Sequence, residues 1–438
     1  MTDQAPPQNV NVLRLVLFGA AIGIPAALAA IAFFTAVHYI EELLWHALPT
    51  ALGEPTPPWY LVVFLPVVGA AIVAAARIGL PGDGGRSPLG AMSHAATPLA
   101  YVPGIVVAAL GTLGFGLVLG PEAPVMAVGS AVGLAITSIV RSNAREQSVL
   151  SMAGIFSAIS TLFGGPLVAG VMLTEGGIAL GPALIPVLLP GFVAAAVGYL
   201  VFLGVGPYTG APAPGLQIPD LPAYVGTSVP DLLIAIVVGI LTAALIVTID
   251  RAAKRVVAVE DRRIGDGRAG LIAVLLLGGL SVGLLAQLAT AFGVAAEDVL
   301  FSGQTSIPTL VTESSLVALL VLVLAKAAAY VVSLATGFRG GPIFPAVFLG
   351  VGVAAFAVQS FGTSPTFAIA IGCAAGMAAQ TRLVVTSMLF AALLVGSGGF
   401  DAIAGTVFAT VASYVTAQAL DPPRRDSTEP VAQPAVTG

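Results

Sequence analysis

The sequence predicts an all-α polytopic membrane protein whose two halves cross the bilayer in opposite directions and contain broken, partly spanning helices. Two compositional observations and one repeated motif lead to this fold class. Apolar residues make up 58% of the 438 residues and charged residues only 8%, whereas soluble proteins carry about 25% charged residues. Apolar runs such as 316–334 are long and continuous, unlike the alternating strands of a transmembrane β-barrel. A Gly-Pro-x-x-Pro motif at 120–124 recurs at 341–345, half a chain later.

The first apolar run, 12–37, follows a segment without basic residues and is too long for the core of a cleaved signal peptide. It therefore predicts an uncleaved first span. At about 20 residues per span with short loops, the chain has room for about ten to twelve crossings. The 52 glycines and 32 prolines suit helices that break inside the membrane.

Basic residues determine the predicted orientation, because the cytoplasmic loops of membrane proteins are enriched in Lys and Arg. The loop 250–268 is the most basic segment, a smaller basic loop contains Arg77 and Arg86, and another begins at Arg141. The polar stretch 207–231 lacks Lys and Arg and is predicted to be external. The chain then divides into a cytoplasmic tail, a first transmembrane half, an external linker, a second transmembrane half and a disordered cytoplasmic tail: 1–11, 12–206, 207–231, 232–420 and 421–438.

The repeated motif predicts two helices that begin inside the membrane. Proline is favoured at the first position of a helix, and both motifs follow glycine-rich segments. Such a helix points unpaired N–H groups and the positive end of its dipole at the middle of the bilayer. Two of them facing each other from inverted halves would form an anion site without a fixed cation. The alternative is that both motifs only kink ordinary spanning helices.

Glu122 is the strongest candidate for a functional residue. It is the only Asp, Glu, Lys or Arg between Arg86 and Arg141, and it lies in the first turn of the first predicted broken helix. A carboxylate at membrane depth is costly, which favours a functional role. The ionised side chain would occupy the N–H groups that bind an anion, and the protonated side chain would leave them. Glu122 thus predicts a gate or proton-coupling element, although it could simply cap its own helix.

Other polar residues at or near membrane depth allow two interpretations each. Glu175 ends an apolar run and is either a second, cytoplasmic-side proton acceptor or an interfacial residue at a helix end. Asp83 lies in a glycine-rich stretch that favours a surface turn, and Tyr414 favours an interface aromatic over a pore-facing hydroxyl. Lys326 in a long apolar span is expected to pair or to reach the interface with its amine.

Several functional classes find no support in the sequence. The single cysteine, Cys373, excludes an intrachain disulfide and a cysteine-based metal cluster. The three histidines show no metal-ligand spacing, and neither a catalytic triad nor a P-loop is present. The net charge of −5 gives no sign of nucleic-acid binding. We therefore expect a protein that is not an enzyme, with no catalytic residues, metal or cofactor, and with membrane lipid around it.

The motifs resemble those of the CLC chloride channels and proton-coupled chloride exchangers. Residues 116–124 are similar to the family's Gly-[Lys/Arg]-Glu-Gly-Pro motif, whose glutamate is the external gate, and residues 337–350 to its Gly-x-Phe-x-Pro motif. The resemblance spans about 12–420 and is strongest to a divergent bacterial branch of ion-transport proteins. It implies an inverted repeat of eighteen helices and a homodimer with one pore per subunit. It also implies a multi-pass protein of the bacterial inner membrane.

The resemblance also implies a set of anion-binding positions: Gly120, Glu122, Ala123, Gly341, Ile343, Phe344, Tyr414 and Asp83. Some positions depart from the family pattern. Pro121 and Pro342 each remove a backbone N–H that could ligate an anion. Asp83 stands where the family has an anion-coordinating serine. Gly176 takes the place of the internal proton glutamate, with Glu175 one position earlier.

The predicted function is CLC-type transport of small anions, chloride first among them, through proton-coupled exchange with Glu122 as the gating residue. Anions and protons would be its small partners. Two alternatives stay open. The displaced internal glutamate would suit a passive CLC-type anion channel. Asp83 and the two missing N–H donors would suit a symporter of another solute or ion that uses a similar broken-helix site.

Overall fold

The computed structural model describes most of the chain between the two termini. The described residues are 12–90, 96–139, 143–178, 184–209, 218, 221–263 and 267–422. The predicted tails at 1–11 and 423–438, part of the predicted external linker and the basic position Arg141 lie outside them. Within the described residues the regular structure is helical, apart from one isolated antiparallel β-bridge between Gly120 and Gly341.

The helices fall into two sets. The first comprises α1 (Val12–Glu41), α2 (Leu48–Ala51), α3 (Trp59–Gly79), α4 (Val102–Leu113), α5 (Glu122–Ile139), α6 (Ala144–Leu162), α7 (Pro166–Gly176) and α8 (Leu184–Thr209). The second comprises α9 (Val229–Arg263), α10 (Arg268–Thr290), α11 (Ala296–Val299), α12 (Ile307–Thr312), α13 (Leu316–Ala335), α14 (Ile343–Phe361), α15 (Pro365–Thr381), α16 (Val384–Val395) and α17 (Ile403–Leu420). Helices α8 and α9 each extend a few residues into the stretch predicted as the external linker.

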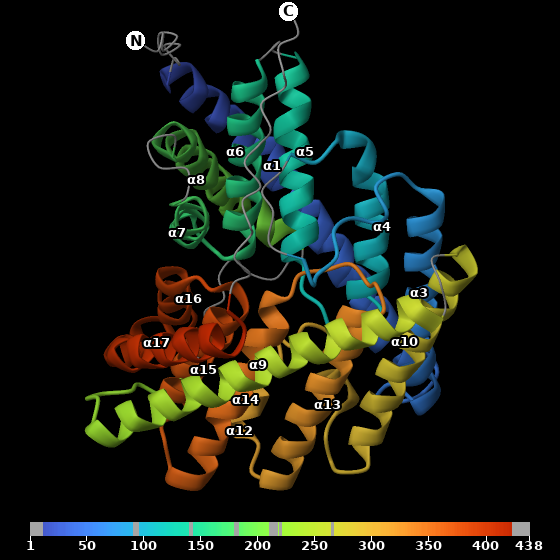
Figure 1. Cartoon of the computed structure of the whole chain (residues 1–438), viewed down its shortest axis with the longest axis vertical. Helices are drawn as coiled ribbons and strands as arrows, with labels where there is room; N and C mark the ends of the chain where they lie inside the picture. The colour runs from blue at the N-terminus through green and yellow to red at the C-terminus, as the bar shows by residue number, and fades with distance from the viewer. Residues whose placement is uncertain are drawn as a thin grey trace, which may run out of the picture.

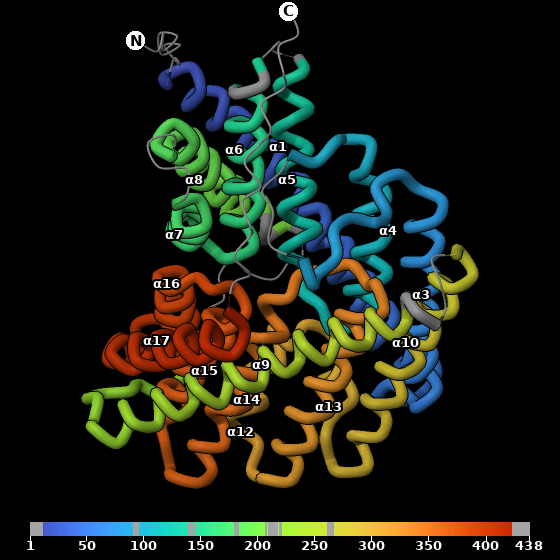
Figure 2. Tube along the Cα trace, in the orientation of Figure 1, coloured from blue at the N-terminus to red at the C-terminus, as the bar shows by residue number. Residues whose placement is uncertain are grey.

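The same packing pattern occurs in both sets. Helix α1 packs on α8 as α9 packs on α17, and α5 packs on α6 as α14 packs on α15. In Figure 1 the green helices α5 to α8 lie above the orange and red helices α14 to α17, and α3 lies beside α10 at the edge. Figure 2 shows α9 running obliquely across the molecule, where it contacts α13, α14, α15 and α17. The fold is thus an all-α inverted repeat, as the repeated motif predicts.

Close approach of glycines holds the central helices of each half together. A side chain on Gly154 of α6 would collide with the backbone oxygen of Gly129 in α5. In the other half, a side chain on Gly350 of α14 would collide with the backbone oxygen of Gly372 in α15. Small residues at such crossings let membrane helices pack backbone to backbone. The repeat therefore extends from the motifs into the packing of the helices that follow them.

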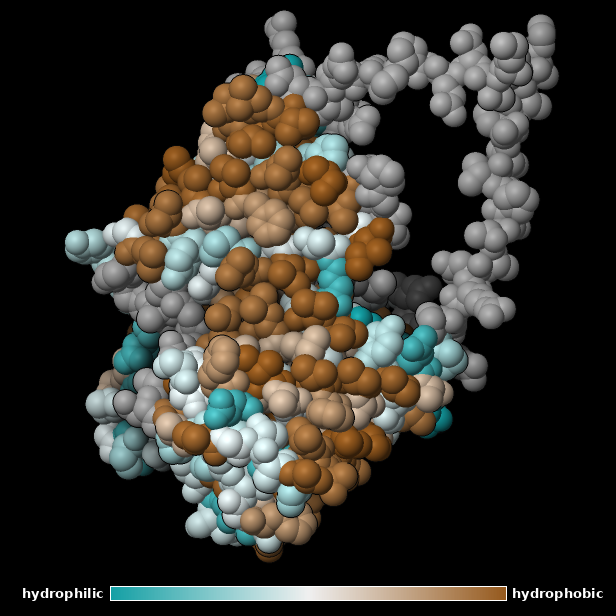
Figure 3. Space-filling model, turned by 90° about the vertical axis from the view of Figure 1, so that its left-hand side faces the viewer, coloured by the Kyte–Doolittle hydropathy of each residue, from teal (hydrophilic) through white to brown (hydrophobic). Residues whose placement is uncertain are grey.

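Eight helices among the described residues are long and apolar enough to cross a membrane, and two further apolar segments, Leu99–Leu113 and Glu122–Ser138, are shorter. This is fewer than the ten to twelve crossings that chain length alone allows. Of the two helices that begin at the Gly-Pro motifs, α14 is among the eight and α5 is among the shorter segments. Many large apolar side chains are exposed, among them Leu17, Leu200 and Leu277. The broad hydrophobic areas in Figure 3 give this face an apolar surface suited to lipid.

Candidate functional site

The two Gly-Pro motifs meet at the centre of the fold. The N–H of Gly120 donates to the oxygen of Gly341 at 2.7 Å, and the N–H of Gly341 donates back to Gly120. The chain breaks that lead into this bridge match as well, since Gly116 and Gly337 adopt φ angles of +86° and +89°. Such left-handed conformations favour glycine. The sequence repeat is therefore also a repeat of backbone conformation, and it brings the starts of α5 and α14 together.

The carboxylate of Glu122 bridges the two halves at this point. Its Oε1 accepts the N–H of Phe344, in the first turn of α14, at 2.9 Å. The side chain is only 1% exposed, and Oε2 is buried without a hydrogen-bond partner in the part of the chain that the structure describes. It lies so close to Gly341 that a side chain at that position would collide with it. The carboxyl group thus occupies the N-terminus of the opposite helix, where dipole and free N–H groups favour negative charge.

The predicted residues Gly120, Glu122, Gly341, Ile343 and Phe344 are therefore brought together. Aromatic packing holds Phe344 in place. Its ring packs against those of Phe163 and Phe390, with ring centroids 5.9 and 6.3 Å away. This aromatic group comes from both halves and surrounds the start of α14 with apolar material. A carboxylate or an anion at this point would be shielded from bulk water.

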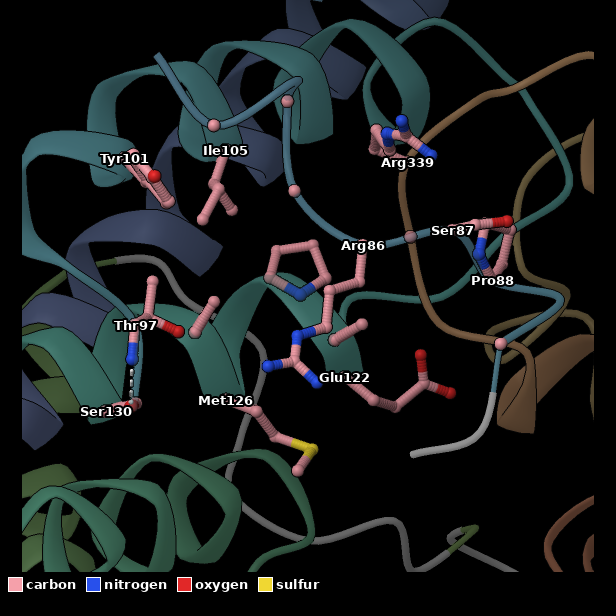
Figure 4. Close-up of a pocket in the computed structure, with 18 of the residues that line it drawn as sticks. Arg86, Ser87, Pro88, Thr97, Tyr101, Ile105, Glu122, Met126, Ser130 and Arg339 are labelled. Atoms are coloured by element: carbon pink, nitrogen blue, oxygen red, sulfur yellow. Dashed lines mark hydrogen bonds between the residues drawn. The ribbon is translucent and has the colours of Figure 1, made fainter. Parts of the chain in front are cut away.

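A cavity of about 290 Å³ lies beside Glu122. Its lining includes Ala123, also predicted as an anion-binding position, and two arginines, Arg86 and Arg339. Figure 4 shows the guanidinium of Arg86 reaching toward the first turns of α5, above Met126. The carboxylate of Glu122 extends from the start of the same helix to the other side. The cavity is thus in contact with the residue that occupies the candidate anion position.

Asp83 does not lie with the residues around Glu122, because its carboxylate forms ion pairs with two arginines. Its carboxylate accepts hydrogen bonds from Arg77, at 2.8 and 3.0 Å, and from Nη2 of Arg339. Its side chain is 57% exposed and faces a different cavity, while the adjacent Gly82 and Gly84 line the cavity beside Glu122. The reason for this position is electrostatic, because the guanidinium groups of Arg77 and Arg339 both attract the carboxylate of Asp83. Asp83 therefore connects the two halves instead of standing at the anion position.

Glu175 is placed at another helix start. Its carboxylate accepts the N–H groups of Val384, Val385 and Thr386 at 2.6, 3.1 and 3.0 Å, and the hydroxyl of Thr386 at 2.7 Å. These bonds cap α16 from the end of α7. The arrangement parallels that of Glu122, since a carboxylate of the first half again binds a helix N-terminus of the second half. Four hydrogen bonds from three residues make Glu175 a structural cap in this conformation.

Tyr414 lies at a second cavity, of about 680 Å³. Asp250, Lys254 and Arg382 line this cavity with it, and Pro342 lines both this cavity and the one beside Glu122. Tyr414 thus lines a cavity that adjoins the one beside Glu122, but it does not line that cavity itself. The structure does not group it with the other predicted anion-binding residues.

Two buried residues shape the second half in ways that the sequence does not reveal. The hydroxyl of Tyr330 donates to the backbone oxygen of Pro342 at 3.0 Å, which anchors the residue before α14. Lys326 is fully buried, and its amine donates to the backbone oxygens of Asp298 and Leu300. A polar residue in an apolar run predicts that its side chain has a polar partner. Which atoms form that partner becomes visible only in the folded structure.

Among the described residues, no group of three or more His, Cys, Asp or Glu is suited to a metal ion.

Broken helices that meet N-terminus to N-terminus between inverted halves define a class of membrane transporters with a site at mid-membrane. The model of the voltage gated chloride channel family matches residues 85–418, and the chain belongs to that family. A relative in Shigella boydii, provisionally named ion-transport protein YfeO, is 30% identical over 377 residues, which is 84% of each chain. The protein of the same name in Escherichia fergusonii is 29% identical over 376 residues.

Solved structures share the fold. A slow cyanobacterial Cl⁻/H⁺ antiporter superposes with a TM-score of 0.74 at 17% identity, covering 93% of this chain and 95% of that one. A CLC-type fluoride/proton antiporter gives a TM-score of 0.69 at 19% identity, covering 94% and 97%. These likenesses confirm the predicted CLC-like architecture of the whole membrane region.

Proposed function

We propose that this protein transports small anions, chloride among them, by proton-coupled exchange, with Glu122 as the gating residue. One observation carries the proposal: the carboxylate of Glu122 accepts the N–H of Phe344 at the start of α14, where an anion would bind. Membership of the voltage gated chloride channel family and the fold shared with Cl⁻/H⁺ and fluoride/proton antiporters support anion transport. The protein would act as a transporter rather than an enzyme.

The gating step follows from competition for one site. The ionised carboxylate of Glu122 and a transported anion both need the positive end of α14. Protonation removes the negative charge and weakens the hydrogen bond to the N–H of Phe344, so the side chain can leave and an anion can enter. One carboxylate oxygen is already without a partner in the described structure, and an unsatisfied buried oxygen costs about 1–3 kcal/mol. The free energy needed to move Glu122 out of this position is therefore lower than it would be if both carboxylate oxygens were hydrogen-bonded.

The hydrogen bonds of Glu175 bear on the choice between a proton-coupled exchanger and a passive channel. Glu175 would contribute to a proton path only if it left the N–H groups of α16 that it now caps. This capping favours the passive channel as a second candidate function, because a fully bonded carboxylate is a poor proton relay. We further propose a homodimer in a bacterial inner membrane, with the basic loop after α9 and both termini on the cytoplasmic side.

Flux measurements with the purified full-length protein in liposomes test the proposal. An outward chloride gradient should drive protons inward against their own gradient, and anion flux should rise as the pH falls. Glu122→Gln should remove this pH response, whereas Glu54→Gln, at an exposed loop position, should keep it. Chloride efflux that moves no protons would contradict the proposed exchanger and support the passive channel. Absence of any anion flux from wild-type protein would overturn both.

A further inference from the structure

Two cavities meet at the start of α14, and each is lined by a carboxyl group. Glu122 lines the cavity of about 290 Å³, and Asp250 of α9 lines the cavity of about 680 Å³. Both cavities are lined by Pro88, Gly90 and Pro342. Figure 4 shows Pro88 on the side of the first cavity toward which the carboxylate of Glu122 extends. The space beside Asp250 therefore adjoins the space beside Glu122.

The carboxyl group of Asp250 holds no part of the fold together. Asp250 follows the uncharged stretch 232–249 of α9 and is half-buried. Its side chain forms no hydrogen bond or salt bridge with the residues that the structure describes. Glu175, by contrast, has both oxygens bonded in the cap of α16 and does not line the cavity. An ionisable residue in a membrane span that faces a cavity without hydrogen-bond partners favours a functional role.

The hydroxyl of Tyr330 connects the surroundings of the two carboxyl groups. It donates to the oxygen of Pro342 at 3.0 Å and lies 3.4 Å from Oε1 of Gln380. Gln380 lines the same cavity as Asp250. Asp250 and Glu122 both interact electrostatically with this hydroxyl. Because such interactions weaken with distance, both carboxyl groups lie near the same tyrosine, and the route between them is bordered by a hydrogen-bonded polar group.

Charged groups around Asp250 come from its own helix and from two others. Lys254 lies one turn further along α9, Arg382 follows α15 and Asp421 follows α17, and all three line the same cavity. Lys254 forms a salt bridge with Asp421 at 3.9 Å, whereas Nη1 of Arg382 is buried without a hydrogen-bond partner among the described residues. Helices α13 and α17 add tyrosine hydroxyls, and α14 has no ionisable residue. The two cations stabilise the carboxylate that remains after Asp250 releases a proton.

We propose that Asp250 binds a proton at the basic end of α9 and passes it to Glu122 through the two adjoining cavities. The inference rests on the proposed proton-coupled exchange and names a second proton-binding residue for it. Both cavities are large enough for water, which can carry a proton between two carboxyl groups. In the transfer the carboxyl of Asp250 loses its proton and becomes a carboxylate, and the carboxylate of Glu122 accepts the proton and becomes neutral. Neutral Glu122 then competes less with an anion for the N–H of Phe344.

Proton movement driven by a chloride gradient tests the inference, with the full-length protein in liposomes and both fluxes recorded together. Asp250→Asn keeps the size of the side chain but cannot bind a proton, so chloride efflux should continue while uphill proton movement is lost. Asp250→Ser should give the same loss, whereas Asp250→Glu keeps a carboxyl and should keep the proton movement. The matched control is Asp421→Asn, because Asp421 lines the same cavity but is paired with Lys254. This variant should move protons as the wild type does.

The outcomes separate this inference from the function on which it rests. Uphill proton movement that persists in Asp250→Asn and Asp250→Ser would overturn the role of Asp250 and leave the proposed exchange intact. An equal loss of chloride and proton movement in these variants would also overturn it, because Asp250 would then support transport as a whole. Loss of proton movement in Asp250→Glu or Asp421→Asn would do the same, since the cavity would then be sensitive to any change. Wild-type chloride efflux without proton movement would overturn the proposed exchange itself.

Discussion

Replacement of Asp83 by asparagine should destabilise the protein through the two arginines that this carboxylate joins. Arg339 has a side chain only 7% exposed, so without Asp83 it keeps a charge with no neutralising partner. Breaking a buried ion pair costs about 3–5 kcal/mol. Because Asp83 itself is 57% exposed, water screens the interaction, and we expect a smaller loss of about 1–2 kcal/mol. Asparagine also tolerates the left-handed backbone, φ +50°, at this position, so the loss reports the charge rather than backbone strain.

Thermal unfolding of the purified protein in detergent measures this effect. Asp421→Asn is the matched control, because its ion pair with Lys254 is 3.9 Å long and both side chains are about half exposed. Such surface pairs contribute about 0–1 kcal/mol, so Asp421→Asn should unfold at nearly the wild-type temperature. Asp83→Asn should unfold at a clearly lower one. Equal unfolding temperatures for the two variants would refute the reasoning that Asp83 holds the halves together.

Three further substitutions probe the site and its supports. Gly341→Ala puts a methyl group where the carboxylate of Glu122 lies, so the carboxylate should be displaced and anion flux at high pH should rise; unchanged flux would contradict this. Glu175→Gln removes the charge that caps α16 and should lower the unfolding temperature through a loss of about 1–2 kcal/mol, with no loss if the cap is unimportant. Gly154→Ala collides with the backbone of Gly129 and should cost about 1–3 kcal/mol, detected as reduced folded yield; a wild-type yield would show that the helices can separate freely.

Much of the architecture follows from local features of the sequence. Long apolar runs require lipid-facing helices, because each helix satisfies its own backbone hydrogen bonds without water. Glycines before a Gly-Pro motif mark a chain break followed by a helix start, and the break is indeed left-handed at both Gly116 and Gly337. The number of crossings was less predictable from the sequence. Length alone does not distinguish a complete span from the shorter broken helices.

By itself the sequence determined that lipid surrounds the chain, that its halves repeat, and that Glu122 stands alone at a helix start. Only the tertiary structure decided where the carboxylates go: Glu122 to Phe344, Asp83 to Arg339 and Glu175 to α16. Each partner lies more than 200 residues away in the other half. Helix signals are local and can be recognised from neighbouring residues, whereas these charge pairings exist only once the inverted halves pack together.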